Sequence, residues 1–373
     1  MHTDRKQTFV SFSWTLSRYL SVQFILAVGI ILSLLIALTY LIDAVEMLRN
    51  VVGKGRAPFT AALMMSLFKL PHLMQKILPF VFLFGAMFNL TRLTKNHELV
   101  VVRAAGLSVW QFLGPAVFIA AISGIFIVTI YDQASSSLYS QYENLQTRYK
   151  AGKQSFLQVS SEGLWLRQGD QNSQSVIHAT TVQASGSQLK NVIIFLYKNN
   201  DVWSGRIDAK SATLKNGYWD ISQATITTLD KPSEFHPTYR LETTLTQNQI
   251  VDSFASPNTI SFWDLPGFIE VAEEAGFSAT RHRLHWHSIL STPILLCAMV
   301  LIAAAVSLRF TRLGGISKML IAGVMAGFLL YFVADVSFAL GLSGSLPVPL
   351  AAWAPTFIAL LLGLTALFYS EDG

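Results

Sequence analysis

The 25-residue stretch Leu107–Tyr131, LSVWQFLGPAVFIAAISGIFIVTIY, contains no charged residue and decides the class of fold. A helix needs about 20 apolar residues to cross the ~30 Å hydrocarbon core of a bilayer. No water reaches the backbone amides inside that core, so a chain that crosses it singly must be helical. The stretch therefore predicts a transmembrane helix.

Five other windows of 20–22 residues are similarly apolar, although two of them carry one or two charged residues. They are Ser21–Leu41, Met74–Leu93, Ser288–Leu308, Met319–Leu340 and Leu350–Tyr369. The first window is too long for the core of a signal peptide, and no small-residue cleavage site follows it. The sequence therefore predicts six retained transmembrane helices.

The composition of the chain agrees with a membrane protein. Only 13% of the 373 residues are charged and 52% are hydrophobic, whereas soluble domains carry about 25% charged residues. This excludes a disordered chain and a purely soluble enzyme. The net charge of +5 comes from basic residues that flank the apolar windows, so we expect no nucleic-acid partner. The single cysteine, Cys297, lies in an apolar run and allows no disulfide framework.

Basic residues in short loops predict the orientation, because such loops stay on the cytoplasmic side. Three clusters fall on one side of a six-helix chain: Arg5, Lys6 and Arg18; Arg92, Lys95 and Arg103; Arg309, Arg312 and Lys318. We therefore expect both termini in the cytoplasm and residues 132–262 outside. The expected order is residues 1–131 with three spans, 132–262 as a soluble domain, 263–287 as a connector helix and 288–373 with three spans.

Residues 132–262 read as an all-β domain, either a sandwich or an open, jelly-roll-like roll. Short β-type runs alternate with turn residues: Ser155–Val159, Gly163–Arg167, Ser175–Ala179, Asn191–Tyr197, Tyr218–Ile221 and Ala224–Thr228. Four aromatic residues in this region have two interpretations, the core of the domain or an apolar groove for lipid: Trp165, Phe195, Trp203 and Trp219. After the domain, Asp264 and Pro266 predict the start of an amphipathic connector helix.

Catalytic and metal-binding motifs are missing. No P-loop, HExxH or GxSxG pattern occurs. His282, His285 and His287 are close in sequence but lie beside Arg281 and Arg283, whose charges would repel a cation. We expect no metal site and no cofactor in this chain, and interpret this cluster as an interfacial basic patch.

The segment Thr94–Val109 predicts a short helix in a cytoplasmic loop, ending near Gly106. It is either an interfacial helix on the lipid or a coupling helix that docks into a groove on a cytoplasmic partner. The residues that would make this contact are Asn96, His97, Glu98, Leu99, Val100, Val101 and Arg103.

Basic residues also occur in the expected outer loop between the first two spans, contrary to the rule that basic loops stay on the cytoplasmic side. Lys69, His72 and Lys76 share one helix face, and Arg49, Lys54 and Arg56 precede them, after Asp43 and Glu46. They either extend to the membrane interface or form a phosphate-binding rim for an anionic lipid head group. Asp335, inside the fifth window, predicts an ion pair within a cavity, a proton relay or simple exposure to water.

These features resemble the Lpt permease family of lipopolysaccharide transport, which has three spans, an outer β-domain and three more spans. The resemblance rests on His97–Gly106, Trp263–Pro266, Arg281–Pro293 and Arg309–Gly315. The C-terminal half resembles the G-type subunit more than the F-type.

The resemblance implies a noncatalytic permease subunit in the inner membrane that extracts lipopolysaccharide and passes it to a periplasmic bridge. It implies an F-type permease, a dimeric cytoplasmic ATPase that binds ATP and magnesium, a single-span bridge protein and membrane lipids as partners. It also implies a coupling helix at residues 96–105 and a cavity between the first and fifth spans, with Asp335 in it. Arg49, Lys54, Arg56, Lys69, His72 and Lys76 become candidates for contact with lipid phosphates.

Two alternatives remain. One is a membrane scaffold whose β-domain binds a periplasmic partner without moving lipid. The other is an ion-coupled carrier that uses Asp335, although the inverted repeats typical of such carriers are not evident.

Overall fold

The computed structural model describes most of the chain. The described ranges are residues 14–52, 58–150, 156–160, 163–169, 173–183, 188–198, 202–228, 231–243, 256–274, 278–312 and 315–372. Lys54 and Arg56, two of the predicted phosphate ligands, lie outside them.

Six helices are long and apolar enough to cross a membrane. Five of them contain a predicted window completely, and the third helix starts at Val109, two residues inside the window Leu107–Tyr131. Their bounds are α1 Trp14–Met47, α2 Phe59–Lys95, α4 Val109–Phe126, α8 Thr280–Arg312, α9 Ile316–Leu342 and α10 Val348–Asp372. Most extend beyond the predicted window at one end or both, because polar residues outside the hydrocarbon can continue a helix.

The third span does not stop at the predicted membrane boundary. After α4 the chain passes through a π-helical turn, η2 Ile127–Tyr131, into α5 Asp132–Lys150. Residues 132–150, which the sequence analysis placed in the β-domain, are therefore helical. The side chains of α5 pack on α2 and on the end of α1, where Tyr142 joins Met47, Ala62 and Met65 in one buried cluster.

Helix α8 is the centre of the helical bundle. In its most apolar window 56% of the residues are buried, and it packs against α2, α4 and α10. Small residues allow the close packing: Ala298, Ala303 and Ala304 are fully buried. Against α4 the approach is closest at Gly124, where an added Cβ would lie 2.4 Å from the Cα of Pro293.

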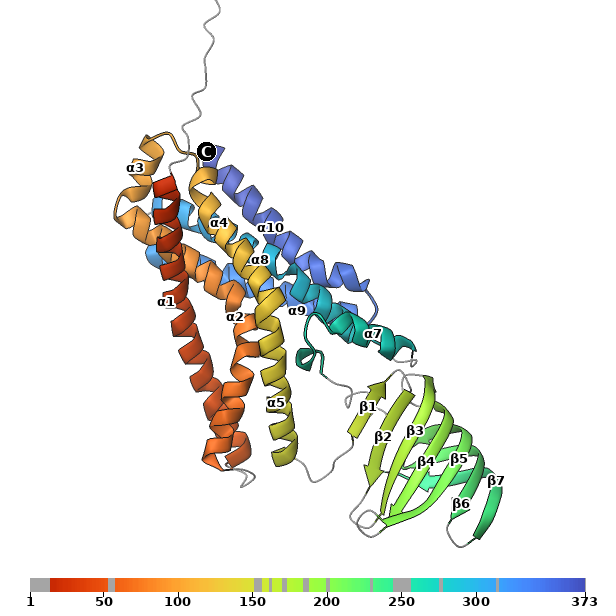
Figure 1. The fold of residues 1–373 in the computed structure, drawn as a ribbon. Helices are drawn as coiled ribbons and strands as arrows, with labels where there is room; N and C mark the ends of the chain where they lie inside the picture. The colour runs from red at the N-terminus through yellow and green to blue at the C-terminus, as the bar shows by residue number, and fades with distance from the viewer. Residues whose placement is uncertain are drawn as a thin grey trace, which may run out of the picture.

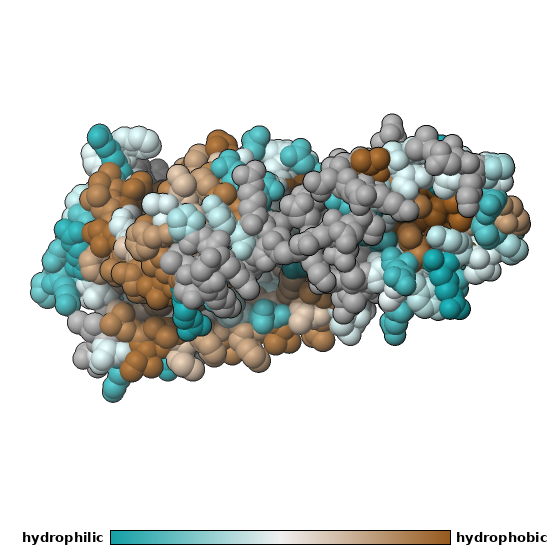
Figure 2. All heavy atoms as spheres, turned by 90° about the horizontal axis from the view of Figure 1, so that it is seen from below, coloured by the Kyte–Doolittle hydropathy of each residue, from teal (hydrophilic) through white to brown (hydrophobic). Residues whose placement is uncertain are grey.

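The short helix α3 Glu98–Ala104 and the C-terminal end of α10 lie at one end of the bundle, and the β-domain lies beyond the other end (Figure 1). Figure 2, seen from below, shows hydrophobic side chains widespread over the helical part at the left of the view. The helical bundle is therefore apolar on the face seen in this view, with α3 at one end and the β-domain beyond the other.

The β-domain between the third and fourth spans is confirmed as a single antiparallel sheet of seven described strands in the order β1 to β7. The strands are β1 Phe156–Ser160, β2 Gly163–Gly169, β3 Ser173–Gln183, β4 Gln188–Lys198, β5 Val202–Lys215, β6 Tyr218–Thr228 and β7 Lys231–Glu242. Every strand pairs with its neighbour in sequence, so the described strands form a meander. Strands β5 and β7 are not among the predicted runs, and β6 is predicted as two separate runs.

The sheet curves until its two ends share one interior. The indole nitrogen of Trp219 on β6 donates to Oε1 of Gln168 on β2 at 3.0 Å, and Thr243 donates to the same oxygen at 2.6 Å. Of the four aromatic residues considered above, only Trp219 is in the core. Trp165 and Trp203 are each 37% exposed. On β2, the alternation of side chains turns Leu164 and Leu166 inward and Trp165 outward.

The chain returns to the membrane through a well-anchored connector. The helix α7 Leu265–Glu274 begins where predicted, and its apolar face of Leu265, Ile269 and Ala272 is buried. It is separate from α8, which already begins at Thr280 and so includes the histidine cluster of the sequence analysis.

Candidate functional site

Two of the six long apolar helices, α1 and α9, are left largely uncovered by the rest of the described chain. In the most apolar window of α1 only 6% of the residues are buried, and in that of α9 only 22% are buried. Leu34 and Leu41 on α1 and Phe328 and Phe332 on α9 are more than half exposed. Apolar faces of this length need lipid or another apolar helix against them.

Asp335 lies on the exposed side of α9 between apolar residues such as Phe332 and Val336. No hydrogen bond or ion pair joins it to another residue in the part of the chain that the structure describes. Asp335 therefore does not form the predicted ion pair with another described residue of this chain. Its side chain faces outward from the bundle.

Lys69, one of the predicted phosphate ligands, is already paired. Its ammonium lies 2.6 Å from Oδ1 of Asp43, and Ser66 donates to Oδ2 of the same carboxylate at 2.5 Å. The ring of Tyr142 covers the ammonium at 5.7 Å. Lys69 thus holds α1 and α2 together near the ends that lie away from α3, and it is not a free ligand in this structure.

The other basic candidates divide into buried and exposed residues. His72 is buried, and its ring packs on Tyr139 with the centroids 4.6 Å apart. Arg49, in the π-helical turn η1 Leu48–Val52, and Lys76 on α2 are exposed. Among the described candidates, therefore, Arg49 and Lys76 are the two with exposed side chains.

The predicted cytoplasmic helix is present as α3. The backbone enters it through His97 in the left-handed conformation (φ 60°), and Gly106 leaves it at φ 83°. The amide of Gly106 donates to the carbonyl of Arg103, and the amide of Leu107 donates to that of Val102. This pair of bonds is a Schellman motif, which needs a residue such as glycine at positive φ.

Helix α3 has one buried side and one free side. Leu99 packs into the bundle beside Leu90 and Leu93, whereas Val100 and Val101 are 60% and 68% exposed. Two bonds fix its acidic first residue: Tyr19 of α1 donates to Oε2 of Glu98 at 3.0 Å, and Asn96 donates to Oε1 at 3.3 Å. The helix is thus attached to α1 and presents valines outward.

Asp132 is a residue that the sequence analysis missed. It is buried at the start of α5 and accepts hydrogen bonds from Gln75 of α2 at 3.0 Å and from the backbone amide of Phe262 at 2.7 Å. The indole of Trp263 donates to the carbonyl of Thr129 at 3.1 Å. These bonds attach the end of the β-domain to the third span, and an acid directly after an apolar run was the available signal.

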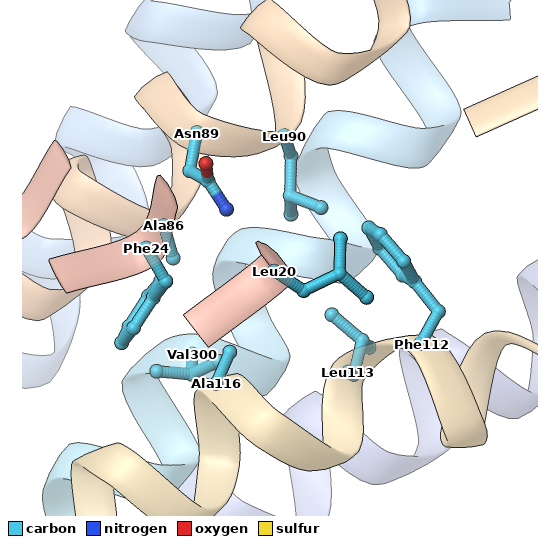
Figure 3. Close-up of a pocket in the computed structure, with 9 residues that line it drawn as sticks. All are labelled: Leu20, Phe24, Ala86, Asn89, Leu90, Phe112, Leu113, Ala116 and Val300. Carbon is cyan, nitrogen blue, oxygen red and sulfur yellow. The ribbon is translucent and has the colours of Figure 1, made fainter. Parts of the chain in front are cut away.

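A small enclosed cavity lies among α1, α2, α4 and α8, lined by apolar side chains and the amide of Asn89 (Figure 3). Its volume is about 10 Å³, which is room for about one water molecule, so it cannot hold a substrate. Among the described residues no three His, Cys, Asp or Glu side chains are grouped so that they could hold a metal ion. His282 instead packs against the ring of Phe268.

Comparison with known proteins gives one consistent result. The family model described as "Lipopolysaccharide export system permease LptF/LptG" matches residues 18–369. The permease LptG of Haemophilus influenzae is 23% identical over 355 residues, which cover 93% of this chain and 96% of the relative. LptG of Escherichia coli K12 is 22% identical over 367 residues, covering 94% and 97%.

Proposed function

The chain belongs to the LptF/LptG family of lipopolysaccharide export permeases, and from this premise we propose how its surfaces divide the work. It is a permease subunit of lipopolysaccharide export in the inner membrane, and a permease subunit is not itself catalytic. The proposal concerns which surface meets the lipid, which meets a second permease and which meets the source of energy.

The uncovered faces of α1 and α9 form the wall of the lipid cavity. A second, F-type permease placed opposite them would enclose the acyl chains, and Asp335 would face that space. Arg49 and Lys76 would attract the phosphates of lipopolysaccharide near the outer ends of α1 and α2. Each exposed basic residue near an anionic surface contributes about 1 kcal/mol.

Helix α3 is the contact to a dimeric cytoplasmic ATPase. Val100 and Val101 are exposed although they are apolar, and Leu99 fixes the helix to the bundle. An apolar helix face of this size suits a groove on a partner. The ATPase would bind ATP and magnesium, and α3 would transmit its motion to α1 through the bond between Tyr19 and Glu98.

The observation that carries the proposal is the position of α3 and the β-domain beyond opposite ends of one continuous bundle (Figure 1). With the termini and α3 in the cytoplasm, the β-domain lies in the periplasm. There it receives the lipid and passes it toward a bridge protein that is anchored by a single span.

Purification of the full chain with its partners tests this. We expect the native chain to carry an ATPase and lipopolysaccharide through purification. Val101→Asp should remove most of the ATPase, because it places a charge in an apolar contact. Phe235→Asp is the matched control, since Phe235 is 63% exposed on β7, and it should retain the ATPase. Unchanged ATPase recovery with Val101→Asp would overturn the assignment of α3.

A further inference from the structure

Near the end of the bundle that carries α3, the uncovered faces of α1 and α9 include a lipid-sized groove. It is a groove of about 540 Å³ between α1, α2 and α9. Apolar side chains form most of its wall: Ile31, Leu34, Leu35, Phe84, Met87, Phe88, Met319 and Leu320. A groove of this size and lining suits an acyl chain.

One end of the groove is positively charged. Arg92 and Lys95, both exposed, line it there. Within the described ranges neither cation has an ion pair or a hydrogen bond to a side chain. The other polar groups of the wall are already bonded: Thr91 donates to the carbonyl of Met87 at 2.7 Å, and Asn96 donates to Glu98.

The extent of the groove matches one leaflet. Along α2 its wall runs from Phe84 to Lys95, which is about 17 Å at 1.5 Å per residue. This is about half of the ~30 Å hydrocarbon core. With the orientation proposed above, its charged end lies at the cytoplasmic surface, whereas the export substrate has its head group at the opposite surface.

We propose that this groove binds an anionic phospholipid of the cytoplasmic leaflet, with an acyl chain along α1 and α2 and the phosphate between Arg92 and Lys95. The charge at the mouth selects an anionic head group over a zwitterionic one. The bound lipid fills the space between α1 and α9 on this side, so the cavity for the exported lipid remains closed toward the cytoplasm. The inference uses the proposed orientation but does not depend on transport.

Native mass spectrometry of the full chain with its co-purifying partners tests the proposal. The probe is a nanodisc of equimolar phosphatidylglycerol and phosphatidylethanolamine. Each lost positive charge should lower retention of phosphatidylglycerol roughly fivefold, and R92Q/K95Q should lower it roughly 25-fold. Retention of phosphatidylethanolamine should not change.

Two matched controls separate the site from general charge and from folding. Arg18 and Arg309 are exposed at the cytoplasmic ends of α1 and α8 and do not line the groove, so R18Q/R309Q should retain phosphatidylglycerol. Leu34→Trp should fill the groove and lower retention. Leu38→Trp, one turn further along the exposed face of α1 and outside the groove, should not.

Equal retention of phosphatidylglycerol by the native chain and by R92Q/K95Q would overturn the proposal. It would also be overturned if lipopolysaccharide were the lipid lost from R92Q/K95Q, since the groove would then belong to the export substrate. Recovery of lipopolysaccharide with the native chain reports on the proposed function separately, so failure of one can be distinguished from failure of the other.

Discussion

The ammonium of Lys69 lies 2.6 Å from the carboxylate of Asp43, and the two side chains are only 18% and 6% exposed. The pair joins α2 to α1 near the ends that lie away from α3, and Ser66 donates to the remaining carboxylate oxygen. A buried carboxylate that loses its partner keeps its desolvation cost without compensation. The contact therefore stabilises the arrangement of the helix that lines the proposed lipid cavity.

Lys69→Met should destabilise the chain by about 3–5 kcal/mol, because it leaves the carboxylate of Asp43 buried and unpaired. Thermal unfolding of the purified chain in detergent measures this. Asp43→Asn combined with Lys69→Met should recover most of the loss, since no charge remains. Lys76→Met is the control and should change stability by less than about 0.5 kcal/mol, as Lys76 is exposed. Equal shifts for Lys69→Met and Lys76→Met would contradict the role of the pair.

Replacing Gly124 by alanine should cause a steric clash at the contact between α4 and α8. A Cβ on Gly124 would lie 2.4 Å from the backbone of Pro293, so Gly124→Ala must separate the two helices. We expect a loss of about 1–3 kcal/mol in the same thermal unfolding measurement.

Gly114 on the same helix is the matched control for this change. An added Cβ there meets nothing within 4 Å, so Gly114→Ala should be neutral or stabilise by up to about 1 kcal/mol through helix propensity. If both alanine variants behaved alike, close packing at Pro293 would not be the reason for glycine at residue 124.

The membrane part could be predicted from the sequence because each span must satisfy its own backbone. Absence of charge over about 20 residues is then sufficient evidence. The ends of the helices could not be predicted this way. Residues 132–150 are polar, and they form α5 because Tyr142 packs on the ends of α1 and α2, which is a tertiary contact.

In the β-domain, too, tertiary pairing forms an element that the sequence pattern alone did not predict. Pro232 and Pro237 argue against a strand, yet β7 forms because it is the last strand of the sheet and pairs only with β6. In the candidate site, the sequence located α3 but not the partner of Glu98, since Tyr19 is 79 residues away in the chain. Likewise, the proximity of Lys69 to Asp43 depends on how α1 and α2 cross.

The hydrogen bond between Trp219 and Gln168 predicts that one buried amide holds the two ends of the β-sheet together. Gln168→Leu keeps the volume but leaves the buried indole N–H unpaired, so it should cost about 1–3 kcal/mol. Urea unfolding of the full chain, followed by tryptophan fluorescence, measures the loss.

Trp165→Phe is the control for this site, because Trp165 is 37% exposed and should tolerate the change within about 0.5 kcal/mol. Combining Gln168→Leu with Trp219→Phe should cost less than the sum of the two single changes, since they remove the same bond. Strict additivity would show that the bond contributes nothing to the sheet.

Loss of the hydrogen bond between Tyr19 and Glu98 should uncouple ATP hydrolysis from lipid release. Tyr19→Phe removes a solvent-exposed hydrogen bond to a carboxylate, worth about 0.5–1.5 kcal/mol, and lets α3 move without α1. In vesicles containing the complete exporter, ATP hydrolysed per lipid released should rise several-fold. Glu98→Lys and Arg103→Glu should raise it further, because they also reverse charge where α3 meets the ATPase.

Tyr40→Phe is the matched control for Tyr19→Phe, since Tyr40 is on the same helix and makes no side-chain hydrogen bond within the described residues. It should leave the ratio of ATP to lipid unchanged. Because the bond is exposed and contributes little to folding, Tyr19→Phe should lower the unfolding temperature only slightly, whereas the ratio of ATP to lipid should change several-fold. A normal ratio with Tyr19→Phe and with both charge reversals would mean that α3 does not carry motion from the ATPase to α1.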